Sequence, residues 1–289
     1  MPPAPETRVG LDVGGTRIRA ARVAPDGALT AHVIEPVVPD RDGFVEQVTR
    51  LIDQTRDATT SGVGIGIPGR VTQDRIISVG YLDIAALPLA RMVTERTGLP
   101  CHLRNDASMA LIAEGRGTDG LIAMVTVGTG VGGALLRDGR PWDGGGFAGQ
   151  FGHIVVSPDG PPCNCGRRGC IETLSAGPAL GILLEDAGLA ATTTAAQVLD
   201  AAEAGDGIAK SIVTAWAAPM VRALQSLVAV VDPAQVIVGG GLGTDMVRAL
   251  KGLPARNTWF GRPVTAARLG DTAGVVGAGL AGFMEGEAR

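Results

Sequence analysis

The chain has 289 residues, a formal net charge of -4 and a sequence pI near 5.4, which excludes the basic footprint expected of a protein that binds nucleic acid or an anionic membrane surface. Hydrophobic residues make up 45% of the chain but aromatic residues only 3%, so small and branched aliphatic side chains must build the core, with 44 glycines at turns and close backbone approaches. This length and composition predict one large α/β domain or two smaller ones and a small-molecule partner.

The N-terminal third predicts a sheet that begins with a meander. Three short segments, RVGLDVG, IRAARVA and LTAHVIE, are rich in β-branched or alternating residues and are separated by Gly or Pro-Asp-Gly, as in antiparallel strands. Apolar residues at helical spacing in FVEQVTRLIDQTR predict a helix, and GVGIGIPG predicts a buried strand that ends in a turn. A βαβ unit is therefore expected after the meander. The first eight residues, MPPAPETR, do not resemble a secretory signal, so a cytoplasmic location is expected.

The chain continues with a helix over PLARMVTERTG, a strand at PCHLR and a helix from about Asp106. From Gly120 a strand, a glycine turn that contains Thr and a second strand repeat the order of LDVGGTRIRA, which suggests two related halves. We therefore expect a smaller domain over 1–118 and a larger one over 119–289, with a last helix over about 273–289 that can pack on the smaller domain.

Further helices are predicted near 178–187, 194–204 and 207–231, followed by the strand QVIVGG. The segment from Ser211 to Val231 is apolar enough to suggest a membrane span. Pro219, Arg222 and Gln225 lie in its middle, however, so it predicts a buried helix of a soluble protein instead.

Three of the four cysteines lie close together in the segment after Gln150. Cys163, Cys165 and Cys170 follow the pattern C-x-C-x4-C, and His153 lies ten positions before the first of them. Thiolates and imidazole are the ligands that zinc prefers in a closed tetrahedral site. A disulfide is disfavoured in a cytoplasmic chain, and unrelated free thiols are usually buried among apolar residues. The segment therefore predicts a structural zinc site.

Three glycine turns follow predicted strands. The turn from Asp12 to Thr16 can cradle phosphate oxygens and place an Asp near magnesium, or can be an ordinary hairpin. The turn from Gly128 to Gly133 has the same two interpretations, and the run from Gly239 to Gly241 follows a hydrophobic strand, at the end where α/β sheets bind ligands. Neither of the first two turns matches the Walker A loop or opens a helix as the dinucleotide fingerprint does.

Asn105 and Asp106 precede the helical run ASMALIAEG. Either residue can cap the helix, and Asp106 can instead be a general base that accepts the proton of a substrate hydroxyl. Both roles are compatible, because a helix N-terminus favours an ionised carboxylate.

These motifs together resemble the ROK family of bacterial sugar kinases and repressors. The matching segments are VGLDVGGTRIRA, RNDASMALIAEG, VTVGTGVGGALL, GQFGH with CNCGRRGC, and VIVGGG, in the same order from about residue 8 to 285. The resemblance implies the actin-like ATPase (ribonuclease H-like) fold, with two α/β domains around a central cleft. It also implies an ATP-dependent hexose kinase that uses Mg²⁺ and a structural Zn²⁺, usually as a dimer or tetramer.

The resemblance implies site residues by position, with Asp106 as the catalytic base. The implied sugar contacts are Asn105, Asp106, Gln150, His153, Glu172 and Gly69; the nucleotide and phosphate residues are Asp12, Gly14, Gly15, Thr16, Arg17, Thr129, Gly130, Gly240 and Gly241; and the zinc ligands are His153, Cys163, Cys165 and Cys170.

Two departures from the family pattern leave the sugar open. Gln150 stands where many members have Glu, and its amide donates as well as accepts hydrogen bonds. Tyr81 either lines the sugar site or lies on a hairpin surface, and Asp83 is placed to face an amine. Glucose is the expected substrate, and an amino sugar such as kanosamine or an N-acylhexosamine is the alternative. A non-catalytic sugar sensor is the alternative from another class; no winged helix-turn-helix precedes the motif at Val9, so no nucleic-acid partner is expected.

Overall fold

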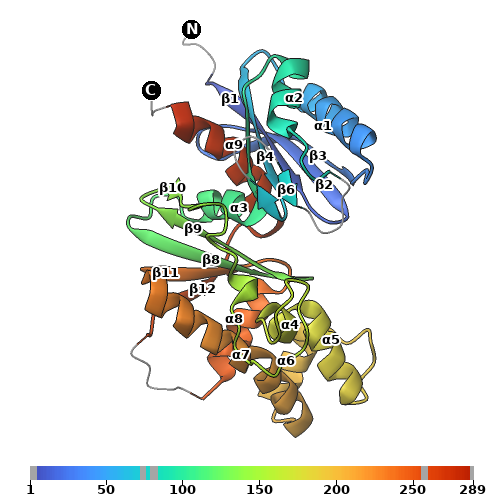
Figure 1. The fold of residues 1–289 in the computed structure, drawn as a ribbon, viewed down its shortest axis with the longest axis vertical. Helices are drawn as coiled ribbons and strands as arrows, with labels where there is room; N and C mark the ends of the chain where they lie inside the picture. Colours follow the sequence, from blue (N-terminus) through green and yellow to red (C-terminus); the bar gives the residue numbers. More distant parts are fainter. Residues whose placement is uncertain (1–4, 72–75, 79–83, 255–259, 287–289) are drawn as a thin grey trace. The chain divides into compact units, whose positions relative to one another are not determined.

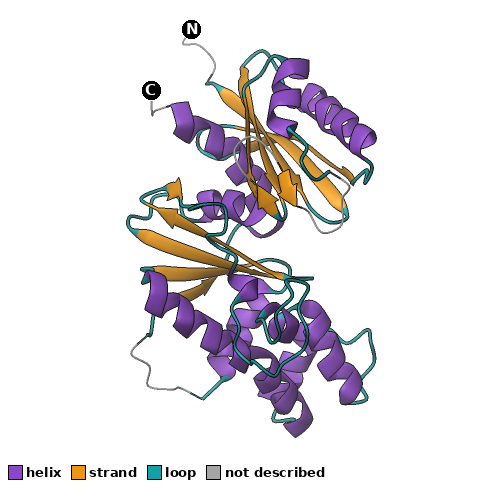
Figure 2. Ribbon diagram, in the orientation of Figure 1, coloured by secondary structure: helices purple, strands orange, loops and turns teal. Residues whose placement is uncertain are grey.

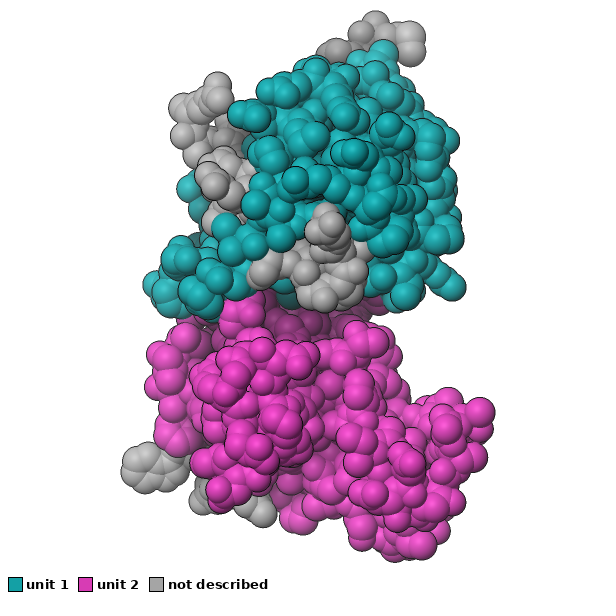
Figure 3. All heavy atoms as spheres, turned by 45° about the vertical axis from the view of Figure 1, so that its right-hand side comes forward, with its two compact units in different colours: residues 1–118, 136–148, 271–289 teal, residues 119–135, 149–270 magenta. Residues whose placement is uncertain are grey.

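The computed structural model describes residues 5–71, 76–78, 84–254 and 260–286, and side chains as far as Phe283. Tyr81 and Asp83 lie outside the described residues. The chain forms two compact units, coloured separately in Figure 3. Unit 1 comprises Met1–Thr118, Leu136–Ala148 and Asp271–Arg289, and unit 2 comprises Asp119–Leu135 and Gly149–Gly270.

Unit 1 is built on a five-stranded sheet in the order β3-β2-β1-β4-β7 (Figure 1). The first three strands form the predicted antiparallel meander, and β4 and β7 run parallel to β1. The strands are β1 (Thr7–Val13), β2 (Arg17–Val23), β3 (Leu29–Pro36), β4 (Thr60–Ile67) and β7 (Cys101–Asn105), with a small hairpin of β5 (Arg70–Val71) and β6 (Ile76–Ser78) beside them.

Helices cover both faces of this sheet (Figure 2). One face carries α1 (Arg41–Thr55) and α2 (Leu89–Thr97), and the other carries α3 (Asp106–Glu114) and the last helix, α9 (Ala273–Gly286). Phe44 and Leu51 of α1 are fully buried against the sheet, as their helical spacing predicts.

The last helix packs closely because glycines line its contacts. A Cβ atom on Gly64 of β4 would overlap the backbone carbonyl of Ala278, and one on Gly277 would overlap that of Met109 on α3. Only glycine permits these backbone approaches. The C-terminal helix therefore packs against β4 and α3, and it also contacts β1, which carries Asp12.

The second sheet has the order β10-β9-β8-β11-β12. Its strands are β8 (Leu121–Val127), β9 (Val131–Arg137), β10 (Arg140–Pro141), β11 (Gln235–Gly239) and β12 (Val264–Ala266), and β11 runs parallel to both β8 and β12. The end of β9 and the whole of β10 belong to unit 1.

The helices of unit 2 are α4 (Glu172–Ser175), α5 (Gly177–Asp186), α6 (Ala195–Glu203), α7 (Gly207–Val231) and α8 (Gly243–Gly252). Two short 3₁₀ turns, η1 (Phe151–His153) and η2 (Gly270–Thr272), complete the described elements. Among the described residues, α7 is the one helix whose length and composition would suit a membrane span, and 56% of its most apolar window is buried inside the protein. Its Trp216 is 1% exposed, as in a core helix.

Candidate active site

Asn105 and Asp106 lie where β7 passes directly into α3. The side-chain Oδ1 of Asn105 accepts a hydrogen bond from the backbone N–H of Ala107 at 2.9 Å, so Asn105 is the N-cap and Asp106 is the first helical residue. The side-chain Nδ2 of Asn105 donates to the backbone carbonyl of Gly69 at 2.9 Å. The predicted contacts Gly69, Asn105 and Asp106 are thus joined within unit 1.

The carboxyl group of Asp106 is harder to ionise than its position at a helix start would suggest. Its Oδ1 accepts the N–H of Ala107 at 2.8 Å, which favours the charged form. Burial outweighs this bond and raises the pKa of Asp106 above its usual value. Burial therefore opposes the effect of the helix N-terminus on this carboxyl group. A raised pKa suits a general base.

Asp12 lies in a network that the hairpin register creates. It faces Arg19 across the β1–β2 pair, and the Arg19 guanidinium lies 3.6 Å from its carboxylate and 2.9 Å from that of Asp271. Burial and the charge of Asp106 raise the pKa of Asp12 to about 7, against the opposing effect of Arg19. A carboxylate with too little positive charge around it suits a bound divalent cation.

The first glycine turn follows Asp12 directly. The backbone N–H of Gly14 donates to the carbonyl of Arg17 at 2.8 Å and closes the turn. Gly15, Thr16 and Arg17 are exposed at its tip. Exposed backbone at the end of a buried strand can receive a phosphate group.

The other two glycine turns lie together in unit 2, at the carboxyl ends of the neighbouring strands β8 and β11. The N–H of Leu242 donates to the carbonyl of Val127 at 2.9 Å, which ties the turn with Gly240 and Gly241 to the turn with Thr129 and Gly130. Thr129, Gly240 and Gly241 are exposed. The carboxyl end of an α/β sheet is where such folds bind ligands.

Glu172 connects the second turn to the cysteine segment. It is the first residue of α4, and its carboxylate accepts the backbone N–H of Val131 at 3.0 Å, immediately after Gly130. Gln150 is half-buried just before η1, and its carbonyl accepts the N–H of His153 at 3.2 Å. Gln150, His153 and Glu172 therefore lie on connected elements of unit 2, because the N–H of Ile171 donates to the carbonyl of Ile154.

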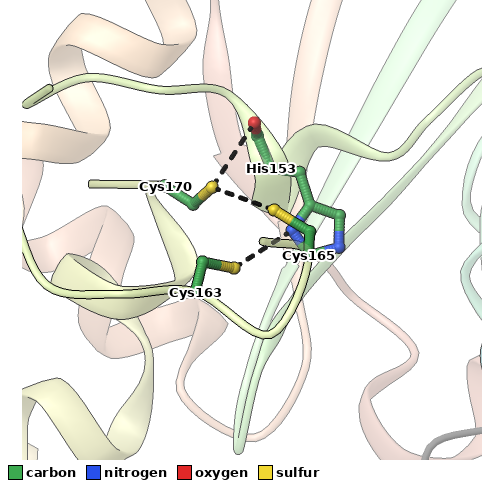
Figure 4. A group of neighbouring side chains, drawn as sticks. All are labelled: His153, Cys163, Cys165 and Cys170. Carbon is green, nitrogen blue, oxygen red and sulfur yellow. Dashed lines mark hydrogen bonds between the residues drawn. The ribbon is translucent and has the colours of Figure 1, made fainter. Parts of the chain in front are cut away.

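The predicted zinc ligands converge (Figure 4). The Sγ of Cys163 lies 3.6 Å from the Nδ1 of His153, the Sγ atoms of Cys165 and Cys170 are 3.6 Å apart, and all four ligand atoms lie within 4.8 Å of one another. A tetrahedral zinc with ordinary bond lengths separates its sulfur ligands by about 3.8 Å, and sulfur from nitrogen by about 3.6 Å. The donor set and its spacing fit the metal.

The thiols are free and differ in acidity. Hydrogen bonds from Arg167 lower the pKa of Cys165 to about 6, whereas burial raises the pKa of Cys170 to about 12. Backbone bonds from Cys163 to Arg167 and from Gly166 to Cys163 shape the loop that carries them. Because the Nδ1 of His153 faces the sulfur atoms, its Nε2 is left for another partner.

Sequence reasoning missed two side-chain groups near these residues. Arg19 could have been found, because the hairpin register places it opposite Asp12. Arg104 and Asp143, which form an ion pair beside Asn105, are 39 residues apart and share no local pattern.

Comparison with known proteins identifies the family. The model of the ROK family matches residues 8–281, and the chain belongs to this family. A glucokinase of Thermotoga maritima is 30% identical over 81% of each chain, and an N-acetylmannosamine kinase of Citrobacter koseri is 32% identical over 81% of this chain and 83% of its own. The crystal structure of a ROK family glucokinase from Streptomyces griseus, in complex with glucose and AMPPNP, matches with a TM-score of 0.75 and 30% identity over 94% of this chain and 98% of that chain. The actin-like ATPase fold predicted from the sequence is confirmed.

Proposed function

We propose that this chain transfers the γ-phosphoryl group of ATP to the 6-hydroxyl of a hexose, with glucose as the preferred acceptor. The family match and the glucokinase and N-acetylmannosamine kinase relatives make it a sugar kinase. The position of Asp106 supports its assignment as the base. Asp106 begins a helix, burial raises its pKa, and it follows Asn105, whose side-chain amide donates to the carbonyl of Gly69.

Asp106 orients the acceptor hydroxyl and takes its proton as the new P–O bond forms. A base with a raised pKa holds that proton more readily than an ordinary carboxylate would. Phosphoryl transfer needs little covalent help from the protein, so alignment of the hydroxyl with the phosphate supplies much of the rate enhancement.

The glycine turns and Asp12 are proposed to hold the nucleotide. Gly14, Gly15 and Thr16 offer the exposed turn after β1, with Arg17 beside them, and Thr129, Gly130, Gly240 and Gly241 offer the paired turns of unit 2. Asp12 is the residue proposed to face Mg²⁺, which when bound with ATP neutralises charge on the phosphate oxygens. The high pKa of Asp12 in the free protein supports this assignment.

The site of His153, Cys163, Cys165 and Cys170 is proposed to hold a structural Zn²⁺. Four protein ligands leave no open position for a substrate. The metal would fix the segment that carries Gln150 and Glu172, and the Nε2 of His153 would face a sugar hydroxyl.

An N-acylhexosamine is the second candidate acceptor. The N-acetylmannosamine kinase relative is as similar to this chain as the glucokinase, and Gln150 can donate a hydrogen bond that a Glu carboxylate cannot. Kanosamine is a further amino-sugar candidate, and a non-catalytic sugar sensor is the alternative from another class.

A coupled assay of ADP release distinguishes these proposals. The purified protein is tested with ATP, Mg²⁺ and each of glucose, mannose, allose, kanosamine, N-acetylglucosamine and N-acetylmannosamine. We expect the highest kcat/KM with glucose. A higher value with an amino sugar would reassign the substrate, and no sugar-dependent ADP release with any of them, despite binding of a sugar, would favour the sensor.

A further inference from the structure

The segment 142–148, here called the acceptor loop, is fastened to unit 1 by two arginines. It follows β10, which packs beside α3 (Figure 1). Each of these arginines is the immediate neighbour in sequence of a proposed sugar contact: Arg70 follows Gly69, and Arg104 precedes Asn105. The loop is therefore attached to β5, which begins directly after Gly69, and to β7, which carries Asn105.

Arg104 holds the start of the loop. Its side chain is only 11% exposed and forms an ion pair with Asp143. The other carboxylate oxygen of Asp143 lies 3.5 Å from the Oγ of Ser108, on the first turn of α3. Because the guanidinium is mostly buried, loss of Asp143 leaves a charge that water can compensate only in part. This contact links the loop to both sides of Asp106.

Asp143 also shapes the loop itself. Its backbone carbonyl accepts the N–H of Gly146 at 2.8 Å and that of Ala148 at 3.4 Å. The residue that pairs with Arg104 therefore also closes the turn that follows. The side chain and the backbone of Asp143 together hold the segment up to Ala148, two residues before Gln150.

Arg70 holds the end of the loop. Its guanidinium carbon lies 3.8 Å from the centre of the Phe147 ring, the geometry of a cation–π contact. Among the described residues, the Nε of Arg70 is buried without a hydrogen-bond partner. Phe147 is nevertheless 61% exposed, so Arg70 fixes the ring without covering it. An exposed aromatic ring in a fixed position can contact the apolar parts of a ligand.

We propose that the acceptor loop determines sugar affinity and selectivity, with Arg104 and Asp143 as positioning residues and Phe147 as a specificity residue for substituents on the sugar. This inference rests on the proposed function, since it assigns the selectivity of the same acceptor site. It predicts that loop variants change the KM for the sugar and the preference between a plain hexose and an N-acylhexosamine, but not the KM for ATP.

The test measures steady-state kinetics of Asp143→Asn, Arg104→Gln, the double variant and Phe147→Ala with glucose, N-acetylmannosamine and ATP. We expect Asp143→Asn to raise the sugar KM about tenfold, less than for a fully buried charge pair, because the Asp143 side chain is partly exposed. The double variant should be no worse than the more affected single variant, because both remove one interaction. Phe147→Ala should change the ratio of kcat/KM for the two sugars at least threefold.

Arg50→Gln is the matched control. It removes a more exposed arginine–carboxylate pair of the same unit, between Arg50 of α1 and Glu35 of β3 at 2.6 Å. It should leave both KM values unchanged. Phe147 is exposed, so its variant tests the inference even if the Arg104 variants fail to fold.

Sugar KM values and sugar ratios equal to those of wild type in both Asp143→Asn and Phe147→Ala would overturn the loop assignment and leave the kinase assignment intact. A parallel rise in the KM for ATP would also overturn it, since that shows a general loss of structure. A wild-type protein that phosphorylates no sugar would overturn the proposed function as well.

Discussion

Replacing Gly274 with Ala should damage catalysis more than stability. Gly274 lies in the first turn of α9, and a Cβ atom there would be 2.5 Å from the carboxyl carbon of Asp12 and 2.6 Å from its Oδ1. Ordinary contact begins near 3.4 Å, so the Asp12 carboxyl must move by about 0.9 Å. Such a misplacement of a catalytic group costs on the order of 100-fold in rate. We expect kcat/KM for ATP to fall about 10- to 100-fold.

Stability should change little, because the gain of roughly 1 kcal/mol for Ala over Gly in a helix offsets part of the local strain. Gly181→Ala is the matched control: Gly181 lies within α5, and a Cβ there would meet no atom within 4 Å. It should stabilise the protein slightly and leave kinetics unchanged. The assay is ADP release at varied ATP and Mg²⁺, with thermal unfolding measured in parallel. Wild-type kinetics for Gly274→Ala would refute the assignment of Asp12 to the nucleotide site.

Two other predictions concern the metal segment and pH. Treatment with a chelator, or Cys170→Ser, should lower the unfolding temperature and increase hydrogen exchange over residues 153–170. Sugar affinity should be lost before nucleotide affinity. Unchanged hydrogen exchange and a metal content below one zinc per chain would contradict the zinc assignment. The pKa of Asp12 is raised from 3.8 to about 7, so this group stabilises the folded state fully below about pH 3.8, and its contribution is lost as the pH rises through 7. Urea unfolding of the ligand-free proteins from pH 5 to 8 should show a weaker pH dependence of stability for Asp12→Asn than for wild type. An identical pH dependence of the two proteins would disprove this prediction.

Local patterns predicted most of the strands, most of the helices and the clustering of His153 with the three cysteines. The meander follows from alternation and turn residues, and the His/Cys cluster from residue types a few positions apart, because both depend on near neighbours in the chain. The strand β12 (Val264–Ala266) was not predicted, since three residues carry too little pattern and its existence depends on pairing with β11.

Long-range contacts explain what the sequence did not predict. Arg19 meets Asp271, 252 residues later in the chain, and Arg104 meets Asp143 across 39 residues. The pKa of Asp106 depends on how deeply its helix start is buried, which no local motif records. The helix start favours the ionised form of this group, and burial opposes it.

The most direct test of the account compares wild-type protein with Asp106→Asn. Sugar and nucleotide binding are measured by calorimetry, and formation of the hexose 6-phosphate is measured by NMR. We expect the variant to bind glucose and ATP with near wild-type affinity but to form the phosphate ester at least about 100-fold more slowly, the contribution typical of a general base. A variant that binds both ligands and still forms the ester at the wild-type rate would contradict the role of Asp106.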